Sequence, residues 1–375
     1  MTAEIRSWLP ERPDPLLTAA LTRLASTEDV RIIAVMPDAH VAEEVCVGTV
    51  TASSTRLFPA AVGGDIGCGV AAVPLGVHAD TLRDRDRAAQ ILAGFERSIP
   101  KLLRSPADAP PLPDELMEQP LSSPAFEKLK SRDARCAYGT LGRGNHFLEI
   151  ERDAGGDLWL TVHTGSRVVG PFVRDRHVAS APRDPMGLAY LSADSDEGRA
   201  YLTDAAWASR FAHYNRRLLL ECASAVVSEA IGAVPDWHSI LECDHDHVRR
   251  EEHGGELLWV HRKGAMFLPE GAVGVLPGSM GTPTYHIEGR GAEEALSSSA
   301  HGAGRCLSRA EARHRVSVRT FHREVEGVYY DHRLSAQLRE EAPSAYKDIA
   351  AVLRAQRPLT KVIRRLDPVL VYKAA

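Results

Sequence analysis

The sequence lacks the features that identify several large classes of protein. No stretch approaches the ~18–20 consecutive apolar residues of a membrane helix, and the acidic, proline-broken N-terminus is unlike a secretory signal peptide. Internal repeats and low-complexity segments are absent. The six cysteines are scattered over 375 residues, which is typical of cytosolic thiols rather than a disulfide scaffold. We therefore expect a cytoplasmic protein with no membrane partner.

Several motifs of metal and nucleotide chemistry are missing too. Without a C-x-x-C pair or an H-E-x-x-H helix, a structural zinc site or a zincin protease has little support. The sequence also contains no G-x-x-x-x-G-K-[ST] phosphate loop and no K-x-D-G motif of lysine-adenylating ligases. If a nucleotide binds, it binds in a different cradle.

The composition is that of an ordinary globular protein with one exception. Hydrophobic residues make up 44% and charged residues 25%, which excludes a disordered chain. Lys+Arg 45 against Asp+Glu 50 gives a net charge of −5, which argues against general polyanion binding through the overall field. The exception is histidine, with 16 residues.

The order of predicted elements favours a mixed α/β (α+β) fold. Strand and helix patterns are interspersed without a regular βαβ rhythm, so neither a simple Rossmann sheet nor a barrel is expected. The longest helical pattern covers residues 204–231, and another helix is expected over 344–355. Prolines and acids concentrated in residues 100–120 predict a surface loop.

Many of the histidines lie in polar, glycine-rich motifs at predicted strand ends or in loops. Glycine lets the backbone approach a ligand closely, and imidazole, thiolate and carboxylate together form a transition-metal ligand set. The motifs are MPDAH (36–40), AVGGDIGCG (61–69), GTLGRGNHFLEI (139–150), HTGSR (163–167), CDHDH (243–247), HRKGA (261–265), PGSMGTPTY (277–285) and HGAGR (301–305).

Five of these residues could bind metal, although each also has a plainer explanation. Asp65 and Cys68 lie three apart in one turn and could converge on an ion, or be a capping residue and a small buried thiol. His146 and His163 belong to two predicted strands joined by a turn at 153–157, where a lone histidine is more often a core residue. His245 lies between two acids and could equally belong to a solvated turn.

His301 is a different case, because Gly302, Gly304 and Arg305 follow it at once. Backbone N–H groups and a guanidinium would bind a phosphate well here. A histidine facing that phosphate could be a nucleophile, a general base or only a hydrogen-bond donor.

Taken together, these motifs resemble the RtcB family of RNA ligases. The match runs in order from MPDAH at 36, through AYKDIAAVLRAQ at 345–356, to VLVYK at 369–373. It thus covers nearly the whole chain. The resemblance implies a single catalytic domain over 1–375, with β-sheets around a central dinuclear metal and nucleotide pocket and helices outside.

The resemblance also implies an activity and residue roles. Such ligases use GTP and Mn²⁺ to join an RNA 3′-phosphate or 2′,3′-cyclic phosphate to a 5′-hydroxyl, in RNA repair or tRNA splicing. Cys68 would bridge two Mn²⁺ ions, with Asp65 and His146 completing one site and His163 and His245 the other, and His301 would become guanylylated. The implied nucleotide contacts are Asn145, Glu149, Ser279, Gly302, Ala303, Gly304, Tyr346 and Lys373. The arginines expected to contact RNA phosphates are Arg167, Arg262 and Arg305.

One departure from the family pattern bears on function. Asp246 follows His245 where the family usually has Asn, and an ionised carboxylate can only accept hydrogen bonds. This motivates a preference for repairing damaged RNA. Two alternatives to a ligase stay open: a metal-dependent phosphodiesterase that only opens cyclic phosphates, and an inactive RNA- or nucleotide-binding paralogue. The expected assembly is a monomer, with an archease-like activator as a candidate partner.

Overall fold

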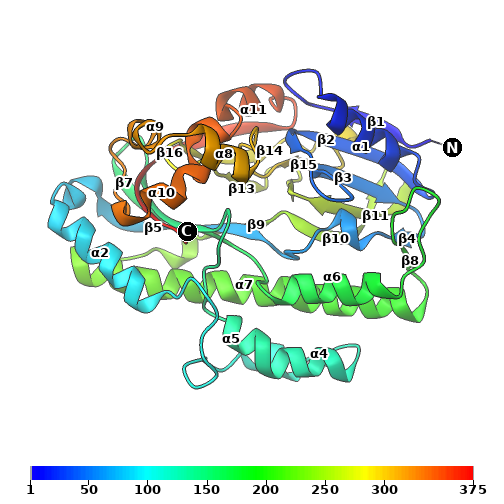
Figure 1. Cartoon of the computed structure of the whole chain (residues 1–375), viewed down its shortest axis with the longest axis horizontal. Helices are drawn as coiled ribbons and strands as arrows, with labels where there is room; N and C mark the ends of the chain where they lie inside the picture. The colour runs from blue at the N-terminus through cyan, green and yellow to red at the C-terminus, as the bar shows by residue number, and fades with distance from the viewer. Residues whose placement is uncertain (1, 375) are drawn as a thin grey trace.

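Two β-sheets form the centre of the protein in a computed structural model that describes residues 2–374. One sheet has five strands in the order β1-β2-β3-β11-β10, and the other has seven in the order β13-β14-β16-β6-β7-β5-β9. Helices lie outside them, with the long α7 running along one side of the molecule (Figure 1). The expectation of a mixed α/β fold is confirmed.

The elements have the following bounds. The strands are β1 (Glu4–Ser7), β2 (Val30–His40), β3 (Val47–Ser53), β4 (Arg56–Leu57), β5 (Gly69–His78), β6 (Phe147–Arg152), β7 (Asp157–Thr164), β8 (Leu191–Ser192), β9 (Leu241–Asp244), β10 (Asp246–His253), β11 (Glu256–Lys263), β12 (Ala265–Phe267), β13 (Val273–Leu276), β14 (Thr284–Gly289), β15 (Ser298–Ala300) and β16 (Thr360–Tyr372). The α-helices are α1 (Pro15–Ala25), α2 (Arg85–Ser98), α3 (Asp114–Glu118), α4 (Pro124–Leu129), α5 (Arg135–Ala137), α6 (Val169–Ala179), α7 (Asp196–Ile231), α8 (Arg309–Arg315), α9 (Val318–Glu324), α10 (Ser335–Leu338) and α11 (Ile349–Ala355).

The long helix α7 supports the seven-stranded sheet. Ser195 caps its first turn by accepting a hydrogen bond from the Gly198 N–H, and Gly232 ends it with φ 72°. Leu219 and Val227 on one face pack into a buried cluster with α2 and strands β5, β6 and β7. The sequence predicted the end of this helix correctly but placed its start at 204 instead of 196. None of the helices among residues 2–374 is both long and apolar enough to span a bilayer.

The proline-rich stretch at 100–120 differs from the surface loop that the sequence predicted. Its second half contains α3, and Leu116 in that helix is completely buried. The Leu116 carbonyl accepts a hydrogen bond from the indole N–H of Trp207 on α7 at 2.9 Å. Apolar residues between the prolines therefore hold this stretch against α7.

Two further differences concern the C-terminal part of the chain. The helix expected over 344–355 begins only at Ile349, because Asp348 caps it by accepting the Ala350 N–H. The strand β16 was not predicted, and it connects β14 to β6 within the seven-stranded sheet. Its end brings Lys373 toward the ligand-bearing strands.

Candidate active site

The five predicted metal ligands lie together at neighbouring strand ends of the seven-stranded sheet. Cys68 directly precedes β5, His146 directly precedes β6, His163 lies near the end of β7, and His245 lies between β9 and β10. Because β6, β7, β5 and β9 are adjacent in this sheet, residues far apart in sequence meet there. Asp65 joins them from the glycine-rich turn before Cys68.

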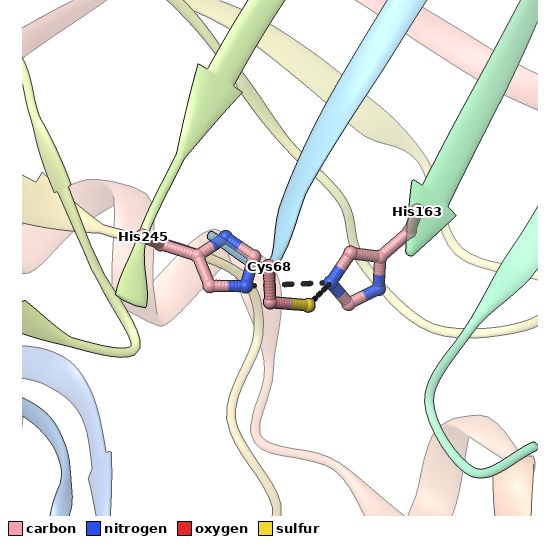
Figure 2. A group of neighbouring side chains, drawn as sticks. All are labelled: Cys68, His163 and His245. Carbon is pink, nitrogen blue, oxygen red and sulfur yellow. Dashed lines mark hydrogen bonds between the residues drawn. The ribbon is translucent and has the colours of Figure 1, made fainter. Parts of the chain in front are cut away.

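Cys68 is shared by two overlapping groups of possible metal ligands. Its Sγ lies 3.6 Å from His146 Nε2 and 3.3 Å from His163 Nε2. One group is Asp65, Cys68 and His146, and the other is Cys68, His163 and His245. Figure 2 shows the thiol of Cys68 between the rings of His163 and His245.

The chemistry of this cluster fits transition-metal ions. His163 Nε2 and His245 Nε2 face each other at 3.4 Å, and Nδ1 of His245 is buried without a hydrogen-bond partner among the described residues. Two facing imidazole nitrogens share at most one proton, so a cation would satisfy their lone pairs better than a hydrogen bond does. Nitrogen, sulfur and carboxylate oxygen form a mixed set suited to such ions.

Burial sets the protonation of the cluster. It lowers the pKa of His163 and His245 well below the usual histidine value, so both rings are neutral at pH 7. Burial, and then the charges of Asp65 and Asp246, raise the pKa of the Cys68 thiol well above its usual value. A bound cation would favour the thiolate instead.

Asp65 is the charged member of the cluster. Its Oδ2 lies 2.9 Å from His146 Nε2. Burial raises the pKa of Asp65, but its hydrogen bond and charge interaction with His146 outweigh burial and lower it to about 2. The cluster therefore offers one ionised carboxylate, three imidazoles and one thiol.

Arg216 on α7 fixes the strand ends that carry these ligands. Its side chain is almost completely buried. Nη1 donates to the carbonyls of Gly67 at 2.7 Å and Thr164 at 3.0 Å, and Nε donates to Glu242 at 2.7 Å. One guanidinium thus links the turn before Cys68, the end of β7 and strand β9.

His301 lies next to the cluster and is oriented by Asp38. The rings of His301 and His245 are 4.7 Å apart, centroid to centroid. Asp38 is completely buried, with Oδ2 lying 2.7 Å from His301 Nδ1 and accepting the backbone N–H groups of His301 and Gly302. The carboxylate therefore lies beside Nδ1, and Nε2 is the ring nitrogen farther from it. The role of Asp38 was missed from the sequence, although the MPDAH motif was the available signal.

A cavity of about 250 Å³ adjoins His301 and is lined by every residue expected to contact the nucleotide. Gly304 in its wall has φ +73°, and an added Cβ would lie 2.2 Å from the Asp38 carbonyl oxygen, so the close approach requires glycine. The wall also contains residues that were not predicted to contact the nucleotide, among them His40, Arg309 and Glu341. The predicted residues in the wall are Asn145, Glu149, Ser279, Gly302, Ala303, Gly304, Tyr346 and Lys373.

Two buried ionisable side chains line this cavity. Glu149 is 5% exposed, and burial followed by the charge of Glu151 raises its pKa well above the usual value. Lys373 is also 5% exposed, and its Nζ donates to the His146 carbonyl at 3.2 Å. The cavity thus contains an acceptor and a cation away from solvent.

The three arginines expected to contact RNA have different positions. Arg305 lines the cavity, and Arg167 donates to His146 Nδ1 at 2.9 Å beside the metal cluster. Arg262 is not brought to the site, because it is completely buried and its Nη2 donates to Glu251 at 2.9 Å. The pairing with Glu251 leaves Arg262 a structural role. The motif position of Arg262 therefore gave a wrong expectation.

The fold and the site together define a mixed α/β protein with a candidate two-metal centre, a histidine beside a buried carboxylate, and an adjoining cavity. The family model described as tRNA-splicing ligase RtcB matches residues 20–131 and 113–374. The chain belongs to the RtcB family, as the motifs predicted.

Relatives in three organisms match over most of their length. An RNA-splicing ligase RtcB of Escherichia coli K12 is 32% identical over 370 residues, covering 91% of this chain and 90% of the relative. A Mycobacterium tuberculosis RNA-splicing ligase RtcB is 28% identical over 90% of this chain and 96% of its own. An Archaeoglobus fulgidus tRNA-splicing ligase RtcB is 29% identical over 90% of this chain and 87% of its own.

Proposed function

We propose that this protein is an RNA ligase that joins RNA 3′-phosphate or 2′,3′-cyclic phosphate ends to 5′-hydroxyl ends, using GTP and two Mn²⁺ ions. The observation that carries the proposal is the Asp38–His301 pair, with His301 facing both the metal cluster and the cavity. Membership of the RtcB family and the names of its relatives support the same reaction class.

The metal ions would be held by Asp65, Cys68 and His146 on one side and Cys68, His163 and His245 on the other. When bound, two such cations neutralise phosphate charge that builds up during in-line displacement. The neutral imidazoles of His163 and His245 are ready to bind without losing a proton. The nucleophile and the groups that orient it are side chains of the protein.

His301 would act as the nucleophile. Asp38 keeps a proton on Nδ1, so the lone pair of Nε2 attacks the α-phosphorus of GTP and the bond to pyrophosphate breaks. The GMP on His301 then passes to the RNA 3′-phosphate, which frees the imidazole and forms a pyrophosphate-linked RNA end. Attack by the 5′-hydroxyl of the second RNA forms the new phosphodiester, expels GMP and releases the hydroxyl proton. A 2′,3′-cyclic phosphate would first be hydrolysed to the 3′-phosphate in the same site.

Two side chains of the cavity wall suit guanine. The N1–H and amino group of guanine are donors beside the O6 acceptor, and the ionised carboxylate of Glu149 with the ammonium of Lys373 offers the complementary pattern. The Gly302 N–H donates to Asp38, so the backbone N–H groups of Ala303 and Gly304 are the ones that can bind phosphate oxygens. We therefore assign GTP as the nucleotide.

The decisive experiment uses α-³²P-labelled GTP and Mn²⁺. We expect an acid-labile protein–GMP adduct in the wild-type chain that is lost in His301→Ala and kept in a control variant, His238→Ala. His238 is exposed and lies outside the cavity. An adduct accompanied by ligation of 2′,3′-cyclic phosphate RNA supports the proposal.

Two other outcomes would contradict it. Opening of cyclic phosphates without an adduct would identify a phosphodiesterase. Absence of both activities, with RNA or GTP still bound, would identify an inactive binding paralogue.

A further part of the proposal concerns the RNA substrate. Asp246 Oδ1 accepts the Gly264 N–H at 2.7 Å beside the site, and we assign this departure from the usual Asn to a role in RNA repair. Asp246→Asn should then raise the rate of ligation of tRNA halves relative to the rate for damaged RNA ends. An unchanged ratio of these rates, with unchanged GTP affinity, would disprove this role.

We further propose that the chain is one catalytic domain that acts as a cytoplasmic monomer. We also propose an archease-like activator as a partner, and adding such a protein to the ligation assay would show whether activity depends on it.

A further inference from the structure

Glu341 is a buried carboxylate in the wall of the cavity that the reaction above does not use. It is only 3% exposed. Its Oε2 accepts hydrogen bonds from Lys373 Nζ at 3.0 Å and from the Tyr346 hydroxyl at 2.8 Å. Its Oε1 pairs with Arg309 and lies 3.5 Å from Arg305 Nη1. One carboxylate therefore contacts four groups that line the same cavity.

These four groups come from separate parts of the chain. Lys373 follows β16, Tyr346 precedes α11, Arg309 begins α8, and Arg305 belongs to the glycine-rich turn after His301. Burial raises the pKa of Glu341, but the charges of Lys373 and Arg309 outweigh burial and lower it to about 2. Glu341 is thus an anion under all ordinary conditions and holds these segments together by charge.

The two carboxylates of the cavity differ in their capacity to accept hydrogen bonds from a ligand. Both oxygens of Glu341 are engaged by protein groups. The Glu149 carboxylate takes part in none of the side-chain hydrogen bonds or ion pairs formed within residues 2–374, so it remains free to accept from a ligand. Glu341 can therefore affect a nucleotide only through the groups it holds.

We infer that Glu341 is a positioning residue that fixes the ammonium of Lys373 against the nucleobase and so sets both GTP affinity and the preference for GTP over ATP. The inference rests on the proposed nucleotide site. Without Glu341, Lys373 keeps only the His146 carbonyl as a partner, and Arg305 and Arg309 repel it. Adenine presents a donor where guanine presents O6, so a misplaced ammonium loses the discrimination between them.

The test compares Glu341→Gln with Glu340→Gln in the full chain. Glu340 is the adjacent residue and pairs with Arg309 and Arg313, but it does not line the cavity. Calorimetric titration with GTP and with ATP in the presence of Mn²⁺ should show GTP affinity weakened by about 10- to 100-fold in Glu341→Gln. The GTP-over-ATP preference should fall as well, whereas Glu340→Gln should stay within about threefold of wild type.

A double mutant separates positioning from a general loss of structure. If Glu341 acts through Lys373, Glu341→Gln added to Lys373→Gln should cause no further loss of base preference. Unchanged affinity and preference in Glu341→Gln, additive losses in the double mutant, or an equal loss in Glu340→Gln would each overturn the inference.

These readouts stay separate from the proposed reaction, because they measure binding alone. A wild-type protein that ligates RNA but shows no effect of Glu341→Gln refutes only the positioning role. Selective GTP binding that Glu341→Gln abolishes, without any ligation, refutes only the proposed reaction.

Discussion

Asp38 shows how a single residue can determine the reactivity of another. It is completely buried, and its carboxylate contacts both the ring and the backbone of His301. Burial lowers the pKa of His301, but the charge and hydrogen bond of Asp38 outweigh burial and raise it. A carboxylate in this position fixes the tautomer and the orientation of the ring.

We expect Asp38→Asn to slow protein–GMP formation by about 10²- to 10⁴-fold, because the amide oxygen can still accept the two backbone N–H groups but carries no charge to orient the imidazole. Single-turnover adduct formation at saturating GTP measures this rate. Thermal melting should show a folded variant. A rate within about threefold of wild type would show that Asp38 has no orienting role.

Glu149 predicts a pH dependence of nucleotide binding. Burial, and then the charge of Glu151, raise the pKa of Glu149, so in the empty cavity its carboxyl keeps a proton to higher pH than an ordinary carboxyl does. Guanine donors require the ionised form, so binding releases a proton and GTP affinity should rise with pH, by at most about tenfold per unit. Calorimetry between pH 6 and pH 8.5 in two buffers of different ionisation enthalpy would measure this release.

Glu149→Gln provides the control for this effect. It should remove most of the pH dependence and weaken GTP binding at every pH. Proton uptake on binding by the wild type, or an affinity independent of pH, would contradict the assignment of Glu149 as the base acceptor.

At the scale of elements, the turn after β7 has room for Asp65 only because it contains Gly165. A Cβ added to Gly165 would lie 2.5 Å from Asp65 Oδ1 and 2.6 Å from its Cγ. Gly165→Ala should therefore displace Asp65 and weaken one of the two metal sites by about tenfold or more, while the site formed by Cys68, His163 and His245 is kept.

Stoichiometric Mn²⁺ titration would count the sites that remain in Gly165→Ala. Gly155→Ala is the matched control, because Gly155 lies in the exposed turn between β6 and β7 and its added Cβ comes no closer than 3.3 Å to another residue. Two full-affinity sites in Gly165→Ala would show that the turn can adjust without cost.

The helices and strands also show how much of the fold could be predicted from local sequence patterns. The helix ending at Ile231 and the hairpin of β6 and β7 have regular periodicity with strong end signals, and both were found. β16 was missed because consecutive arginines at 364 and 365 and a proline at 368 break its alternation, whereas its pairing with β14 and β6 is set by tertiary contacts.

At the scale of the whole molecule, the motifs predicted which residues meet but could not show how they are held. Cys68, His146, His163 and His245 converge because their strands are neighbours, which no local pattern encodes. Arg216 and Glu341 lie outside the glycine-rich motifs, and only the folded chain shows that they anchor the ligand strands and the cavity wall. Arg262 is the opposite case, because it lies inside a motif but its guanidinium pairs with Glu251 in the protein interior.

The convergence of four strands on one metal cluster links metal binding to global stability. In the absence of a cation, buried imidazoles and a buried thiol are crowded within 4.8 Å, and only the folded chain brings them together. A ligand that binds only the native state stabilises it by about 2.7 kcal/mol at a concentration 100 times its Kd. Mn²⁺ should therefore raise the Tm by several degrees, and chelation should reverse the rise.

Cys68→Ala should abolish most of this Mn²⁺-dependent rise, because Cys68 is the ligand shared by both groups. Cys222→Ala is the matched control, since this half-buried thiol on α7 lies outside the cluster. Differential scanning calorimetry with and without Mn²⁺ would measure both variants. An equal Mn²⁺ shift in Cys68→Ala and wild type would mean that the stabilising ion binds elsewhere, whereas a loss confined to Cys68→Ala ties the stability of the whole chain to the strand ends where the ligands meet.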